Sequence, residues 1–269
     1  MGTPVAVSPL PLHTESEILA ERPAGVVIGR FAPNPRITVI DFPSLLAQGL
    51  AFNRIAAFVE KLGLPHDRVL TDPELAAAIQ ADNATAETYY YGHDYRLADV
   101  RRFFTTAARE GIALGRDERQ LHDLLDQHGL LAPGTGGAVI SIPREGSDPF
   151  VDASGRASLL RHELSHGEYF TNPAYAAFSK YFWTTEMTKS DRASFREFLT
   201  RQGYDPKNED LLINETQAHL MHTTDGRYFN ARSCGLPVAR VEQLRAAFLA
   251  MMPAGWLHDA AQSVRAALP

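Results

Sequence analysis

The stretch RASLLRHELSHGEYF, residues 156–170, carries the residue spacing with the clearest chemistry in this chain. His162 and His166 are four residues apart, and Glu163 directly follows the first of them. On a helix, side chains at this spacing lie one above the other, so both imidazoles can reach one ion while the carboxylate lies beside it. The pattern predicts a zinc site with His162 and His166 as ligands.

A catalytic zinc ion takes three protein ligands and keeps its fourth position open. The segment INETQAHLMHTTDGRYF, residues 213–229, offers Glu215, His219 and His222 on a predicted helix. Glu215 and His219 share one face of that helix, and His222 follows three residues later. The third ligand is therefore expected among these three side chains.

The segment RHELSH and the NExxA pattern of Asn214, Glu215 and Ala218 resemble the two ligand helices of the gluzincin metallopeptidases, the broad zincin group that contains thermolysin. The resemblance covers residues 138–229. It implies a zincin-like core in which Glu215 completes the ligand set of one Zn²⁺ ion per chain. It also implies zinc-dependent hydrolysis of peptide bonds in a peptide or protein substrate.

Two further expectations follow from the resemblance. In that group an edge strand ahead of the ligand helix binds extended peptide by backbone pairing, and residues 138–142 would take its place. Thermolysin-like relatives also have an aspartate four residues beyond the third ligand, where it supports a zinc-bound histidine. Here that position is His219, so the surroundings of the ligands must differ or the third ligand must be reassigned.

The expected mechanism follows from the chemistry of zinc, which lowers the pKa of a bound water from about 15.7 towards about 7 and polarises a carbonyl. Glu163 would act as general base and return the proton to the leaving amine. A second donor would stabilise the oxyanion, and four side chains are candidates by position: Tyr228, His222, His219 and Tyr175.

Two other functions remain open. A zinc-stabilised binding or regulatory protein would keep the same fold with little turnover. A zinc amidase acting on cell-wall peptide would share the ligands and the base but act on a different substrate. A simpler interpretation, in which His162 and His166 are surface histidines beside a salt-bridged Glu163, is disfavoured by the partner segment at residues 213–229.

Short β-branched runs and amphipathic helical patterns make up the rest of the chain. Strands are expected at residues 26–28, 37–40 and 138–142, the first two separated by a turn at Pro33 to Pro35. Three- and four-residue spacing, a capping-box pattern at Thr71 and Pro237 in a first-turn position predict the helices: 45–62, 71–81, 97–110, 117–127, 174–183, 190–202, 209–222, 237–252 and a short terminal one.

These elements predict an α+β, predominantly helical fold, a zincin-like core with a small sheet. Residues 1–24 are expected to form an extended leader, because the start of the chain is rich in proline. Residues 25–131 should form a mostly helical region packed on residues 132–269, the metal-binding catalytic region.

The run TYYYGHDY, residues 88–95, is rich in tyrosine. Such a run could form the aromatic wall of a substrate cleft, but packing of the helical region against the zinc-bearing region is the favoured interpretation. His93 and Asp94 could orient one another within it. GTGG at residues 134–137 lacks the residues of a phosphate-binding loop and is expected to be a plain loop.

Composition narrows the class of protein. The 269 residues are 45% hydrophobic and 22% charged, which is typical of a globular protein. A formal net charge of −6 argues against a nucleic-acid partner. The single cysteine, Cys234, excludes an internal disulfide. The chain has no membrane-spanning run and no export signal. The resemblance to degradative peptidases favours a periplasmic or secreted setting. The oligomeric state is left open.

Overall fold

The structure, a computed structural model, describes residues 9–267 and confirms a predominantly helical α+β fold with one mixed five-stranded sheet. The strand order is β1-β2-β3-β5-β4. In that order the strands are β1 (Leu12–His13), β2 (Val27–Phe31), β3 (Ile37–Phe42), β5 (Ala138–Pro143) and β4 (His93–Arg96). β5 is parallel to β3, whereas β4 is antiparallel to β5.

The resemblance implied an edge strand at residues 138–142, and this expectation is wrong. β5 pairs with β3 on one side and with β4 on the other, so its backbone has no free edge for a peptide. All six of its residues are buried. The short strand β4, which the sequence did not predict, is the edge strand next to α6 (Ala153–Thr171), the helix of the HExxH pattern.

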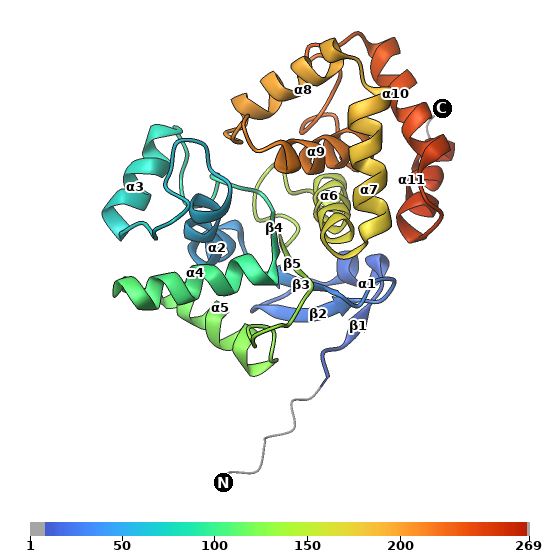
Figure 1. The fold of residues 1–269 in the computed structure, drawn as a ribbon. Coiled ribbons are helices and arrows are strands. Elements are labelled where there is room, and N and C mark those ends of the chain that lie inside the picture. Colours follow the sequence, from blue (N-terminus) through green and yellow to red (C-terminus); the bar gives the residue numbers. More distant parts are fainter. Residues whose placement is uncertain (1–8, 268–269) are drawn as a thin grey trace.

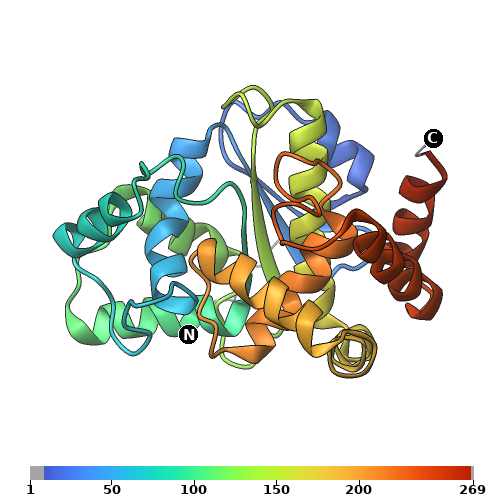
Figure 2. The same ribbon diagram turned by 90° about the horizontal axis from the view of Figure 1, so that it is seen from above.

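Side chains alternate between the two faces of the sheet, and each face has its own helices. Ile40 and Val139 face a core shared with α2 (Leu45–Val59), α4 (Leu97–Glu110) and α5 (Arg116–Gln127). Val39 and Ile140 face α1 (Glu15–Ala20) and α6 (Ala153–Thr171). The sheet is therefore buried between two helical layers (Figures 1 and 2).

A further group of helices lies beyond α6 and encloses an aromatic core of its own (Figure 1). Its members are α7 (Pro173–Tyr181), η1 (Phe182–Glu186), α8 (Lys189–Arg201), α9 (Glu209–Gln217), η2 (Ala218–His222), α10 (Val238–Met251) and α11 (Trp256–Ala267). The helix α3 (Asp72–Ala81) lies at the opposite end of the molecule (Figure 1). Across residues 9–267, every helix is too short or too polar to cross a bilayer.

The prediction of an extended leader is wrong for residues 15–20, which form α1, while residues 1–8 lie outside the described part of the chain. The Thr14 side chain accepts from the backbone N–H of Glu17, and the Glu17 carboxylate accepts from the backbone N–H of Thr14. This capping box starts a helix despite the neighbouring prolines. Ile18 then anchors α1 in the core beneath the sheet.

The helix α6, which carries His162 and His166, is held closely against the sheet. Asp152 caps its first turn by accepting from the backbone N–H of Gly155 at 2.8 Å. Further along, a Cβ atom at Gly167 would lie only 2.8 Å from the Ile37 side chain. The glycine therefore lets α6 approach β3, which fixes the height of the two histidines above the sheet.

Candidate metal centre

The three predicted ligands converge on one point between α6 and α9. The Nε2 atoms of His162 and His166 are 3.0 Å apart. Glu215 presents Oε2 at 3.9 Å from His162 Nε2 and Oε1 at 3.6 Å from His166 Nε2. Ligand atoms on a tetrahedral zinc ion, at roughly 2.0–2.2 Å from the metal, lie roughly 3.3 Å from one another. The three side chains thus fit a zinc ion with small adjustments.

The Glu215 carboxylate is buried without compensation by the protein. The residue is 1% exposed, and neither of its oxygens has a hydrogen-bond partner. Burial, and then Glu60 and Glu163, raise its pKa well above the usual value, although the Tyr204 hydroxyl is near enough to lower it somewhat. An unpaired buried carboxylate is costly, and a cation between it and the imidazoles would remove that cost.

His219 and Asp94 flank the same carboxylate from opposite sides. His219 Nε2 lies 3.7 Å from Glu215 Oε2, and His162, Glu215 and His219 form one group able to hold an ion. Asp94, His166 and Glu215 form a second such group. The sequence alternative of His219 as a ligand is therefore compatible with the geometry.

The proton on His162 can be placed from its hydrogen bonds. The Thr223 hydroxyl is 2.7 Å from His162 Nδ1 and 3.1 Å from the carbonyl oxygen of Ala218. The carbonyl can only accept, so the hydroxyl donates to it and accepts from the imidazole. Nδ1 of His162 then carries the hydrogen, and the lone pair of Nε2 faces Glu215.

Glu163 lies beside the ligands in the position expected of a base. It is 4% exposed, lines a cleft at the centre, and its Oε2 has no hydrogen-bond partner. Burial raises its pKa well above the usual value, with Glu60 adding to the effect; a divalent cation nearby would lower the pKa again. A Cβ at Gly92 would lie 2.1 Å from Glu163 Oε1, so any side chain there would displace the carboxylate.

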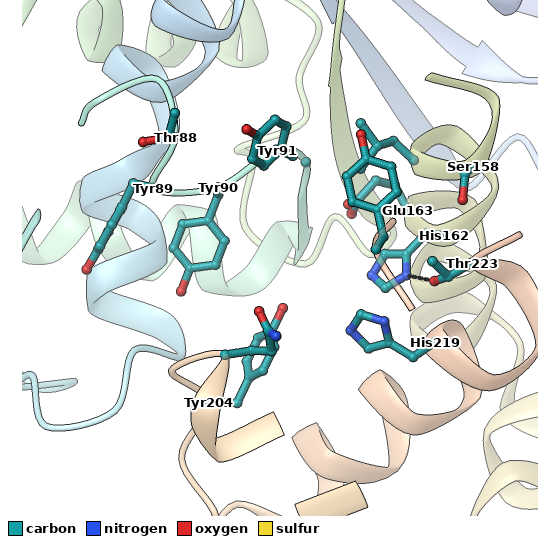
Figure 3. Close-up of a pocket in the computed structure, with 14 residues that line it drawn as sticks. Thr88, Tyr89, Tyr90, Tyr91, Ser158, His162, Glu163, Tyr204, His219 and Thr223 are labelled. Atoms are coloured by element: carbon teal, nitrogen blue, oxygen red, sulfur yellow. Dashed lines mark hydrogen bonds between the residues drawn. The ribbon is translucent and has the colours of Figure 1, made fainter. Parts of the chain in front are cut away.

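The cleft at the metal centre has an aromatic wall (Figure 3). Tyr89, Tyr90 and Tyr91 face His162 and Glu163 across it, so the tyrosine run does line a cleft. The hydroxyls of Tyr89 and Tyr90 are buried and lack hydrogen-bond partners. Packing with locally satisfied hydroxyls, the favoured interpretation from the sequence, does not describe these two side chains.

The four candidate oxyanion donors are placed differently. His219 lines the cleft. Tyr228 also lines it, but its hydroxyl donates to the carbonyl oxygen of Phe150. His222 is fully buried outside the cleft, with Nε2 at 3.1 Å from the Tyr175 hydroxyl, which itself donates to Gln217. The structure therefore does not bring His222 or Tyr175 to the metal centre.

Three residues at the site had no signal in the sequence. Tyr204 lines the cleft from the loop after α8, where the segment RQGYDP reads only as a turn. Thr223 follows η2, a π-turn that a regular helical pattern does not reveal. Asp94 points to α6, whereas His93 points to the opposite face and stacks on Phe52, so these two neighbours do not orient one another.

Buried acidic groups continue beneath the metal centre. Burial raises the pKa of Glu60 to about 8, and burial together with Glu163 raises that of Asp94 well above its usual value. Such a concentration of carboxyl groups favours a bound cation.

Comparison with protein-family models, with curated proteins and with solved structures finds no match to this chain.

Proposed function

We propose that the protein is a zinc-dependent peptidase with a zincin-like core of the gluzincin type. The observation that supports this most strongly is the convergence of His162 Nε2, His166 Nε2 and the unpaired Glu215 carboxylate beside an accessible cleft. Glu163 borders the same cleft with a free oxygen. Ligands without a general base would suit a structural ion, whereas this combination suits hydrolysis.

Zinc at this centre would acidify a water molecule and polarise the scissile carbonyl. Glu163 Oε2 has no other partner, so it is free to take the proton of the attacking water and pass it to the leaving nitrogen. Tyr204 and His219 border the cleft near Glu215 and are placed to donate to the developing oxyanion. Tyr204 replaces Tyr228 in this role, because the Tyr228 hydroxyl is already engaged.

The lining of the cleft favours cleavage within a polypeptide. Among the described residues that line it, the only imidazole or carboxyl side chains are those of His162, Glu163 and His219. No lysine or arginine in this lining can bind a terminal carboxylate, and the one carboxylate is the proposed base. The edge strand β4 lies next to the centre and offers a backbone for an extended substrate.

A zinc-stabilised binding or regulatory protein is the second candidate, and His219 favours it. A fourth protein ligand would close the coordination sphere, as in structural zinc sites. His219 Nε2 is as near to Glu215 as the proposed ligands are. If the site is open, replacing His219 by alanine would abolish neither hydrolysis nor zinc binding. If His219 closes the site as a fourth ligand, the same replacement would weaken zinc binding strongly.

The test is the exchange of the base for its neutral isostere. We expect Glu163→Gln to bind zinc with the affinity of the wild-type chain, because the ligands are untouched. Hydrolysis should fall about 10²- to 10⁴-fold, the usual contribution of general acid–base catalysis. The measurements are zinc content by elemental analysis and cleavage of casein, of blocked peptide libraries and of peptidoglycan.

Two matched variants accompany it. Glu87→Gln neutralises an exposed carboxylate next to the cleft wall and should leave both zinc content and rate unchanged. Glu215→Ala should remove most of the zinc. Activity of Glu163→Gln equal to that of the wild type would exclude the peptidase function, and cleavage of peptidoglycan alone would indicate the cell-wall amidase.

A further inference from the structure

We propose that Asp94 of the edge strand β4 is a positioning residue for the metal centre, holding the proton on Nδ1 of His166 so that Nε2 faces the ion. This inference rests on the proposed zinc site. It assigns to the edge strand a part of the outer shell that the sequence resemblance placed at position 219.

The first support is the unsatisfied state of His166. Its ring is fully buried, and Nδ1 has no hydrogen-bond partner. Asp94 Oδ2 is 3.7 Å from that nitrogen, and the Asp94 side chain is 11% exposed. An approach of under 1 Å would form a hydrogen bond of ordinary length. His162 already has such a partner in Thr223, so His166 is the ligand still lacking one.

The second support is the register between β4 and α6. Residues two apart on a strand share a face, and residues three or four apart on a helix share a face. Three pairs follow one another along these two faces: Gly92 against Glu163, Asp94 against His166, and the Arg96 guanidinium 4.4 Å from the Phe170 ring. Gly92, immediately before the strand, and Asp94 within it therefore lie against the proposed base and one proposed ligand at consecutive positions of one face.

Asn214 is the other polar side chain close to the His166 ring. Its Oδ1 already accepts from Gln217 Nε2 at 3.3 Å. A carboxylate is also the stronger acceptor of the two. Asp94 is therefore the better partner, and the two residues can be compared directly.

A histidine ligand donates its second N–H to an acceptor in nearly all zinc sites, because this fixes the tautomer and the direction of the ring. With the proton on Nδ1, the lone pair of His166 Nε2 points at His162 and Glu215. Without the acceptor, the ring could carry its proton on Nε2, which cannot bind a metal. Loss of Asp94 should therefore weaken zinc binding even though Asp94 is not itself a ligand.

The experiment compares the whole chain with Asp94→Ala, Asp94→Asn and Asn214→Ala. Zinc affinity is measured by competition with a chromogenic chelator, and the ring tautomer by ¹⁵N–¹H correlations of the histidine side chains in the zinc-loaded protein. We expect Asp94→Ala to bind zinc about 10- to 100-fold more weakly. The protected Nδ1 proton of His166 should disappear in that variant. Asp94→Asn keeps an acceptor oxygen and should lose less affinity.

Asp99→Asn is the matched control, because Asp99 lines the same polar cavity as Asp94 and pairs with Arg102 on the surface. It should bind zinc as the wild type does. Wild-type affinity and an unchanged Nδ1 signal in Asp94→Ala would overturn the inference, as would a loss confined to Asn214→Ala or a loss equally large in Asp99→Asn. If the wild-type chain itself binds no zinc, the proposed function fails as well, and the two failures are thereby distinguished.

Discussion

At the residue scale, the metal centre depends on groups that hold other groups in place. Thr223 fixes the proton of His162, and Gly92 gives Glu163 its position by having no side chain. These partners come from segments far from the HExxH pattern in the sequence.

The close approach at Gly92 predicts that a substitution there lowers the rate of hydrolysis without lowering zinc affinity. In Gly92→Ala, the new methyl would meet the Glu163 carboxylate, whose flexible end moves aside more easily than backbone. We expect zinc affinity and thermal stability to stay near wild type, while hydrolysis falls about 100-fold because the base is displaced by about 1 Å. Steady-state kinetics and zinc titration provide the measurement.

Gly25→Ala is the comparison for this prediction, since no atom lies within 4 Å of a Cβ built there. It should leave the rate unchanged. If Gly92→Ala hydrolyses substrate as fast as Gly25→Ala, the position of Glu163 does not limit the reaction.

The sequence could predict only the residues of the centre that share local spacing. The spacing of His162, Glu163 and His166 on one helix follows from periodicity, whereas the choice of Glu215 over His219 and His222 came from the resemblance to the gluzincin pattern. Tyr204 and Thr223 reach the site through a loop and through a π-turn, neither of which has a residue pattern of its own. Their positions depend on tertiary packing.

At the element scale, α6 is the helix on which the whole centre depends, and a buried ion pair holds its first turns. Arg156 is fully buried; its guanidinium donates to Asp41 Oδ2 of β3 at 2.5 Å and to the carbonyl oxygen of Ile18 in α1 at 2.8 Å. Burial raises the pKa of Asp41 to about 6 although Arg156 acts to lower it. One side chain thus joins three elements.

Removal of this arginine should be strongly destabilising. Arg156→Met would leave the Asp41 carboxyl buried without its partner, and we expect the free energy of unfolding to fall by about 3–5 kcal/mol. Urea-induced unfolding at neutral pH, followed by circular dichroism, measures the change.

The surface pair of Arg22 and Glu145 is the matched control, because its side chains are 51% and 29% exposed. Arg22→Met should change the free energy of unfolding by about 1 kcal/mol or less. Equal effects of the two substitutions would show that the buried pair does not anchor α6.

The elements that could be predicted are those with long amphipathic or β-branched patterns. The helix at residues 97–110 has the predicted bounds, and α5 begins one residue before its predicted start. β4 was missed because HDYR carries three polar residues, and it becomes a strand only by pairing with β5. The predicted helix at 209–222 splits into α9 and the π-turn η2, a change of hydrogen bonding that periodicity cannot detect.

At the scale of the whole molecule, the boundary expected at residue 131 runs through the middle of one sheet. β2, β3 and β4 come from the first region, and β5 comes from the second. β5 lies between β3 and β4, so residues 132–269 have no complete core without residues 25–131. Separation into two regions remains a description of the sequence rather than of the packing.

This arrangement predicts how a fragment behaves. Residues 132–269 alone would expose both edges of the buried strand β5, and such edges promote aggregation. We expect no cooperative thermal transition and no stoichiometric zinc binding from this fragment. Coexpression with residues 1–131 should restore both. A fragment that melts cooperatively and binds one zinc ion on its own would contradict the shared sheet.

The tyrosine wall of the cleft belongs to a loop that contributes no metal ligand. Substitutions at residues 89–91 should therefore alter which substrate side chains the cleft accepts, while the proposed ion site and base stay unchanged. That freedom stops at residue 92, where the chain passes against the Glu163 carboxylate. A library randomised up to that point would retain turnover and diversify selectivity, and one extended past it would collect inactive clones.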